Sequence, residues 1–256
     1  MKRVLTAAAL IPIICYVVLW APLPAFLAVL AVAACLTWRE YKDIALPGGE
    51  LSWRSLLGYG AGLAVLFIPA EPWAIVLAVG LIVLALEMRS ADLADTLPRA
   101  AALTFGVVYV FGSWRCASFL RVANPHWLMY ALLVSWAGDI GAYYIGRNFG
   151  HHRLAERVSP KKSWEGAAAS VIAALAIAGA YLAYFVRVPV AAALALTAVA
   201  NVAGQIGDLA ESAIKRGAGV KDSGAILPGH GGFFDRVDST LFVLPVVYFY
   251  VRWLAG

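Results

Sequence analysis

The charged residues between Ser212 and Asp238 have the types and spacing of a site for phosphates and a metal ion. Glycines are interleaved there with side chains of both charge signs: Lys215, Arg216, Lys221, Asp222, His230, Asp235, Arg236 and Asp238. Glycines let a backbone approach a ligand closely and offer N–H groups to an anion. Carboxylates, together with substrate phosphates, are usual ligands of Mg²⁺. This stretch therefore predicts that basic side chains bind phosphates and that aspartates bind a cation.

Asp208 extends the stretch on its N-terminal side. If a spanning helix continues past the membrane surface, Asp208, Glu211, Ser212 and Lys215 fall on one face of that helix. A carboxylate at the end of a spanning helix is costly unless it is paired, solvated or bound to metal. The alternative to a functional role is an intrahelical contact, Asp208 with Ser212 or Glu211 with Lys215, on a solvated face. The residues by themselves leave these two interpretations open.

Asp235 and Asp238 share a face if a helix begins at this point. Such a pair suits a magnesium ion that also binds substrate phosphates. The alternative is an ordinary helix start, because acidic residues are favourable near the positive end of the helix dipole. That alternative accounts for one aspartate better than for two.

These residues must be positioned by membrane-spanning helices, because the rest of the chain is apolar. The chain is 62% hydrophobic and 14% charged, whereas soluble domains are roughly a quarter charged. Apolar runs near the length of a spanning helix recur at 4–20, 23–37, 55–70, 72–87, 100–119, 127–145, 166–186, 188–207 and 239–254. The predicted fold class is all-α: a polytopic integral membrane protein of one domain (1–256) with about nine transmembrane helices. The first run has no clear cleavage site, which favours an uncleaved helix.

The basic residues predict the orientation of these helices. With a cytoplasmic N-terminus, all of the 20 Lys and Arg residues except Arg115, Arg121, Arg187 and Arg252 lie on the cytoplasmic side. The net charge of +5 is therefore explained by membrane topology and gives no reason to expect nucleic-acid binding. Two cytoplasmic loops are rich in glycine and charge, 136–166 and 204–238. We interpret the earlier segment Trp38–Asp43 as an interfacial anchor.

The motifs in the second half resemble one family of membrane enzymes. Ser212-x-x-Lys215-Arg216, Lys221-Asp222-x-Gly224, Pro228-Gly229-His230-Gly231-Gly232 and Asp235-Arg236-x-Asp238 are similar to the signature of phosphatidate cytidylyltransferases, also called CDP-diacylglycerol synthases. Upstream, Asp139-x-Gly141-Ala142-Tyr143, Gly146-Arg147-x-Phe149-Gly150 and Ser159-Pro160-Lys161-Lys162-Ser163-Trp164-Glu165-Gly166 also resemble this family. Ser163 replaces a frequent Thr, His151 replaces a frequent Lys, and Ala167-Ala168 replace a glycine-containing pair. Residues 1–130 carry only membrane character, and 131–256 form the expected catalytic half.

The resemblance implies transfer of the cytidylyl group of CTP to phosphatidic acid, which yields CDP-diacylglycerol and pyrophosphate for phospholipid biosynthesis. It implies Mg²⁺, with room for a second cation, held by Asp208, Asp235 and Asp238. Catalytic roles are expected for Ser212, Lys215, Arg216, Lys221, Asp222, His230 and Arg236. Substrate binding is expected from Asp139, Ser159, Lys161, Lys162 and Glu165. For the two lysines, attraction of anionic headgroups is an equal alternative.

The resemblance also implies a setting. We expect the enzyme in a bacterial inner membrane with its active site facing the cytoplasm. Its expected partners are CTP, phosphatidic acid and the bilayer, without nucleic acid, and a homodimer is an open option.

Two other functions compete with this hypothesis. A transporter usually has charges near the bilayer midplane and repeated halves, whereas here the acids gather at one predicted face and the sequence has no apparent repeat. The CDP-alcohol phosphotransferases have the motif DG-x-x-AR…G…D…D, and this sequence lacks it.

Overall fold

The computed structural model describes residues 2–46, 52–69, 71–90, 92–226 and 231–254. Each predicted apolar run forms a helix, and the first half of the chain contains α1 (Lys2–Leu19), α2 (Leu23–Ala45), α3 (Trp53–Phe67) and α4 (Pro72–Glu87). Next comes one long helical stretch, in which α5 (Thr96–Gly106) is joined to α6 (Ser113–Ala123) through a π-helical turn, Val107–Gly112. A short 3₁₀ turn, Leu93–Asp95, precedes it.

The second half contains the longer helices and the only strands in the described part of the chain. Helix α7 (Pro125–Phe149) leads into an antiparallel hairpin of β1 (Arg153–Ala155) and β2 (Ser159–Ser163). Helix α8 (Trp164–Ala174) continues through π-helical turns to Val186 and is followed by α9 (Val190–Gly217). The last helix, α10 (Phe234–Phe249), ends in another π-helical turn, Tyr250–Leu254.

The length and apolar character of these helices identify an integral membrane protein. Among the described residues, six stretches are long and apolar enough to cross a bilayer: Leu23–Ala45, Leu93–Ala123, Pro125–Phe149, Trp164–Val186, Val190–Gly217 and Phe234–Leu254. Leu10–Leu19 and Pro72–Glu87 are apolar but shorter. The all-α polytopic class is confirmed, whereas the count of nine crossings stays a prediction.

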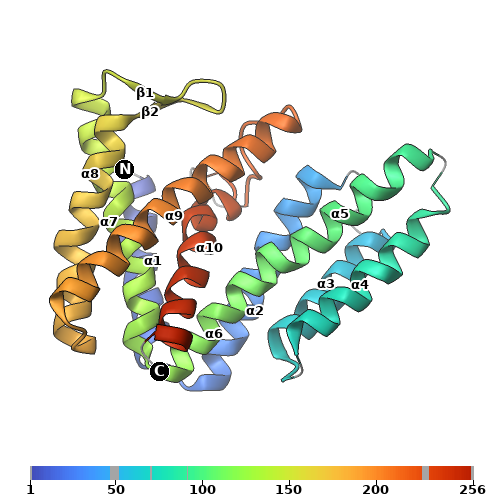
Figure 1. Ribbon diagram of the computed structural model, residues 1–256, viewed down its shortest axis with the longest axis horizontal. Helices are drawn as coiled ribbons and strands as arrows, with labels where there is room; N and C mark the ends of the chain where they lie inside the picture. Colours follow the sequence, from blue (N-terminus) through green and yellow to red (C-terminus); the bar gives the residue numbers. More distant parts are fainter. Residues whose placement is uncertain (1, 47–51, 70, 91, 227–230, 255–256) are drawn as a thin grey trace.

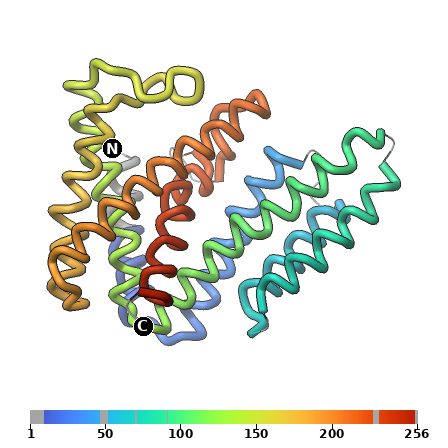
Figure 2. The backbone as a smooth tube through the Cα atoms, in the orientation of Figure 1, coloured from blue at the N-terminus to red at the C-terminus, as the bar shows by residue number. Residues whose placement is uncertain are grey.

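The two predicted charged loops lie at the same end of the bundle. Figure 1 shows the β1–β2 hairpin and the C-terminal end of α9 at the upper edge, with the C-terminus of the chain at the lower edge. Helices α7 to α10 form one group, while α3 and α4 stand beside α5 on the other side (Figure 2). The polar ends of the second-half helices are therefore neighbours in space.

Glycines bring the helices of the second half into close contact. A Cβ atom on Gly141 of α7 would lie 2.6 Å from the carbonyl oxygen of Ala169 in α8. A Cβ atom on Gly207 of α9 would lie 2.8 Å from the carbonyl oxygen of Asp238 in α10. Small residues allow such approach between helices in membranes. This packing places the acidic ends of α7, α9 and α10 beside one another.

The structure corrects two sequence-based expectations. The segment Trp38–Asp43 belongs to α2, and Trp38, Glu40, Tyr41 and Lys42 in it are buried, so the interpretation of this segment as an interfacial anchor is wrong. The first predicted loop is also shorter than expected, since α7 extends to Phe149. The predicted continuation of α9 past Asp208 is confirmed.

Candidate functional site

A cavity of about 630 Å³ opens between α7, the hairpin, α8 and α9. Four of the predicted substrate and metal residues line it: Asp139, Lys161, Lys162 and Asp208. Arg147 and Arg153 also line it, and Ser239 contributes from α10. The two predicted loop regions therefore meet at one concave site, with residues from both 136–166 and 204–238.

The cavity combines basic and acidic side chains. Lys162 Nζ lies 2.6 Å from Asp208 Oδ2, and this ion pair connects β2 to α9. Lys161 and Asp139 are exposed where they line the cavity. Together with the two arginines, these residues give the walls four cationic and two carboxylate groups. Such a lining suits a polyanionic ligand that carries a cation.

Three aspartates from three helices lie within electrostatic reach of one another. Asp139 of α7 and Asp208 of α9 repel each other, and both repel Asp238 of α10. Lys162 and Arg236 partly offset the charge at Asp139. The close packing of α9 against α10 at Gly207 brings Asp208 and Asp238 together. An oxygen-rich group of like charges is stabilised by a cation.

The aspartate carboxylates suit part of the coordination shell of a magnesium ion, but not all of it. Among the described residues, no three His, Cys, Asp or Glu side chains are arranged to hold a metal ion by themselves. Mg²⁺ usually takes one or two carboxylates and completes its shell with water and substrate phosphates. Asp208 and Asp238 match that requirement in chemistry, because both offer hard carboxylate oxygens beside a cationic cavity.

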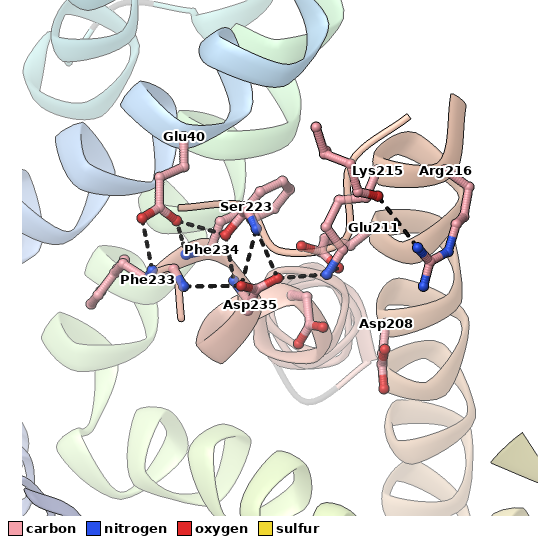
Figure 3. Close-up of polar contacts among 12 residues, drawn as sticks. Glu40, Asp208, Glu211, Lys215, Arg216, Ser223, Phe233, Phe234 and Asp235 are labelled. Atoms are coloured by element: carbon pink, nitrogen blue, oxygen red, sulfur yellow. Dashed lines mark hydrogen bonds and ion pairs between the residues drawn. The ribbon is translucent and has the colours of Figure 1, made fainter. Parts of the chain in front are cut away.

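Asp235, in the first turn of α10, has different neighbours from Asp208 and Asp238. It contacts Lys215 of α9 and the loop between α9 and α10. Its Oδ1 accepts a hydrogen bond of 2.5 Å from Lys215 Nζ, and its Oδ2 accepts from the backbone N–H groups of Ser223 at 3.1 Å and Gly232 at 3.0 Å (Figure 3). Lys215 also pairs with the buried Glu211 at 2.6 Å. In this arrangement Lys215 and Asp235 organise the loop, and neither residue lines the cavity.

The remaining predicted catalytic residues lie around the loop or outside the described chain. Arg216 Nη1 donates to the carbonyl oxygen of Val220 at 3.4 Å. Lys221 and Asp222 are exposed, and Ser212 is half-buried on α9. His230 lies outside the described residues.

Glu165 holds the hairpin in place and does not line the cavity. Its Oε1 lies 2.6 Å from His152 Nδ1 and also accepts from the His152 backbone N–H at 3.2 Å. This contact fastens the start of the hairpin to the first turn of α8. Ser159, at the beginning of β2, is likewise absent from the lining.

Sequence reasoning missed a polar row deeper in the cavity. Asn201 Nδ2 donates to Ser170 Oγ at 3.1 Å, and Gln205 Nε2 donates to Asn201 Oδ1 at 2.8 Å. Asn201 and Gln205 precede Asp208 on the same helix, within an otherwise apolar stretch. Amide side chains inside a spanning helix are a recognisable signal of a polar path, and this signal could have found both residues.

The family comparison and the similar proteins agree on one family. Residues 1–254 match the cytidylyltransferase family. The chain is 36% identical over 231 residues to the phosphatidate cytidylyltransferase of Staphylococcus aureus (strain COL), which covers 86% of this chain and 85% of that protein. It is 46% identical over 124 residues to the phosphatidate cytidylyltransferase of Bacillus subtilis (strain 168), which covers 48% of this chain and 46% of the relative.

Proposed function

Because this chain belongs to the cytidylyltransferase family, we propose that it transfers the cytidylyl group of CTP to phosphatidic acid. The products are CDP-diacylglycerol, a precursor in phospholipid biosynthesis, and pyrophosphate. The names of the relatives support this reaction. The observation that carries it is the cavity at the helix ends, which Arg147, Arg153, Lys161 and Lys162 line together with Asp139 and Asp208.

The position of the cavity suits one soluble substrate and one lipid substrate. CTP approaches from water, whereas the phosphate of phosphatidic acid lies at the membrane surface. A cavity at the polar ends of spanning helices can receive both. The distribution of basic residues supports a cytoplasmic opening, and the bacterial relatives support the inner membrane. Association of two copies stays a prediction.

The chemistry requires positioning more than proton transfer. The phosphate monoester has a second pKa of about 6 and is largely dianionic near neutral pH. One of its oxygens attacks the α-phosphorus of CTP, a new P–O bond forms, and the bond to pyrophosphate breaks. The main barrier is bringing two anions together, which cationic side chains lower by holding them in line.

We assign triphosphate neutralisation to the four basic residues of the cavity. Lys162 is anchored by Asp208, so its ammonium group is already oriented toward the cavity before substrate binds. Ser212, Arg216, Lys221, Asp222, His230 and Arg236 keep their predicted catalytic roles at the loop. Asp139 keeps its predicted role at the nucleotide end. Ser159 and Glu165 do not line the cavity and act through the hairpin that carries Lys161 and Lys162.

We propose that Asp208 and Asp238 hold Mg²⁺, with room for a second cation. The third predicted ligand, Asp235, is bound instead by Lys215 and by backbone N–H groups. Bound magnesium would neutralise phosphate charge and stabilise the departing pyrophosphate. The repulsion among Asp139, Asp208 and Asp238 supports this assignment. Asp235 keeps its protein contacts in the loop and orders the first turn of α10.

The experiment is an assay of purified protein with labelled CTP, phosphatidic acid and Mg²⁺. We expect labelled CDP-diacylglycerol and pyrophosphate in equal amounts. No CDP-diacylglycerol under any metal condition would exclude the proposal. Consumption of CDP-diacylglycerol with an alcohol acceptor would point to a phosphotransferase, and substrate flux into liposomes without nucleotide turnover would point to a transporter.

A further inference from the structure

Glu40 is a buried carboxylate in the first half of the chain that the family motifs do not contain. It lies near the C-terminal end of α2 and is 2% exposed. A buried charge is unfavourable unless hydrogen bonds satisfy it. Among the described residues, its three hydrogen-bond donors belong to the segment 223–234, more than 180 residues further along the chain.

The Glu40 carboxylate caps the N-terminus of α10. The N-cap residue, Phe233, has no side chain that can accept a hydrogen bond. Instead, Glu40 Oε1 accepts from the Phe233 backbone N–H at 3.0 Å, and Glu40 Oε2 accepts from the Phe234 backbone N–H at 2.7 Å (Figure 3). The carboxylate therefore satisfies donors that a helix start leaves unpaired and lies at the positive end of the helix dipole.

Ser223 connects Glu40 to Asp235. Its hydroxyl donates to Glu40 Oε2 at 2.8 Å and accepts from the Asp235 backbone N–H at 3.3 Å. Its own backbone N–H donates to the Asp235 carboxylate. Glu40, Ser223 and Asp235 thus form one continuous hydrogen-bonded chain from α2 to the first turn of α10.

Two glycines of the motif leave room for this carboxylate. A Cβ atom on Gly224 would lie 2.5 Å from Glu40 Oε1. A Cβ atom on Gly232 would lie 2.4 Å from Glu40 Oε2 and 1.9 Å from Ser223 Oγ. All three distances are too short for any side chain. The glycines at these positions are therefore required by the approach of Glu40 as well as by the loop.

We propose that Glu40 is a positioning residue of the cytidylyltransferase site, which fixes the first turn of α10 and so the carboxylates of Asp235 and Asp238. The inference rests on the proposed function for its effect on catalysis. It assigns to the first half of the chain a direct role in the site, since α2 supplies the anchor for a helix that carries three charged motif residues.

The test compares Glu40→Gln with Glu87→Gln in the full-length protein in detergent. Glu87 is a matched control, because it is also a buried carboxylate of the first half, where it binds Arg54 away from the cavity. In Glu40→Gln an NH₂ group faces N–H and O–H donors. We expect kcat to fall by about tenfold or more and half-maximal activity to require more Mg²⁺. Glu87→Gln, matched in thermal stability, should keep wild-type kcat and metal dependence.

Hydrogen exchange supplies a readout that does not depend on catalysis. We expect faster exchange of the backbone N–H groups of Phe233 to Asp238 in Glu40→Gln, with no change there in Glu87→Gln. Unchanged exchange, or a kcat and Mg²⁺ requirement within twofold of the wild type, would overturn the proposal. If the wild type makes no CDP-diacylglycerol, the proposed function is wrong. The exchange measurement still tests whether Glu40 orders the first turn of α10.

Ser223→Ala keeps the proposal testable if Glu40→Gln does not fold. This variant removes the hydroxyl link but leaves both backbone contacts of Glu40, so a smaller loss of kcat and the same direction of change in Mg²⁺ requirement are expected. In the double variant, effects on kcat should be less than additive, because both residues act on one helix end. Wild-type kinetics in Ser223→Ala, or full additivity, would count against a shared role.

Discussion

The charged residues divide into two groups with different neighbours. Asp139, Lys162 and Asp208 line the cavity, where the Lys162–Asp208 ion pair connects the hairpin to α9. Lys215 of α9 and Asp235 of α10 bind each other beside Glu40 and Ser223. Asp238 stands between the groups, since it interacts electrostatically with both Asp208 and Glu211. Substitutions in the two groups should therefore differ in their kinetic effects.

Asp208→Asn tests the metal assignment at the cavity. The amide keeps the shape but loses the negative charge, so we expect kcat to fall by about a hundredfold or more and the Mg²⁺ requirement to rise. A magnesium titration of activity measures both, with Asp238→Asn in parallel. If both variants keep wild-type metal dependence, the ligand assignment is wrong.

Lys162→Ala tests phosphate neutralisation. Loss of a cation that faces the triphosphate should raise KM for CTP by about tenfold, because one charge-assisted contact contributes on the order of 1.5 to 3 kcal/mol. Arg157→Ala is the control, since Arg157 is an exposed basic residue of the same hairpin outside the cavity lining. If the two variants have the same KM for CTP, Lys162 does not bind the triphosphate, and attraction of lipid headgroups is favoured. In that case a steady-state titration with phosphatidic acid should show a raised KM for the lipid in Lys162→Ala.

Close contacts between the helices of the second half bring their polar ends together. Helices α7 and α8 approach at Gly141, and α9 and α10 approach at Gly207. Two aspartates from different helices can face one substrate only if their backbones are this close. The hairpin then covers the cavity and is fastened by the contact between His152 and Glu165.

Gly207→Ala tests this packing. Its Cβ would lie 2.8 Å from the Asp238 carbonyl oxygen, so α9 and α10 must separate at a cost of about 1 to 3 kcal/mol. We expect a lower midpoint of thermal unfolding in detergent and a lower kcat. Gly60→Ala in α3 is the control, because its Cβ meets no atom within 4 Å, and it should leave kcat unchanged. Full activity in Gly207→Ala would show that the spacing of these helices is not critical.

At the scale of the whole molecule, all polar helix ends that form the site lie at one face of a membrane bundle (Figure 1). The first half contributes through α2, whose buried end meets the loop after α9. The two halves of the chain are therefore in contact at this loop, although the motifs occur only in the second half.

Single cysteines test the predicted orientation. In a variant without Cys15, Cys35 and Cys116, Lys221→Cys should react with a membrane-impermeant maleimide only from the cytoplasmic side, and Arg252→Cys only from the opposite side. Labelling of intact cells and of inverted vesicles measures this. Labelling of both positions from the same side would show that α10 does not cross the membrane between them.

The sequence by itself determined the membrane class, the order of the helices and the identity of the motifs. Apolar length is a local property, and the motif spacing of Ser212–Asp238 needs no knowledge of contacts. Even the continuation of α9 past Asp208 follows from helical spacing. The hairpin was not predicted, because its strands are short and mostly polar.

Only the tertiary structure decided which of these residues meet. It placed Lys162 on Asp208, directed Asp235 into the loop, and set Glu40 at the start of α10. The local pattern around Glu40, aromatic and charged residues at a helix end, favoured an interfacial anchor. The hydrogen-bond donors of Glu40 lie more than 180 residues further along the chain, so no periodicity or spacing in the sequence predicts these contacts. Burial turned that carboxylate into a cap for another helix, because a buried charge is stable only where hydrogen-bond donors surround it.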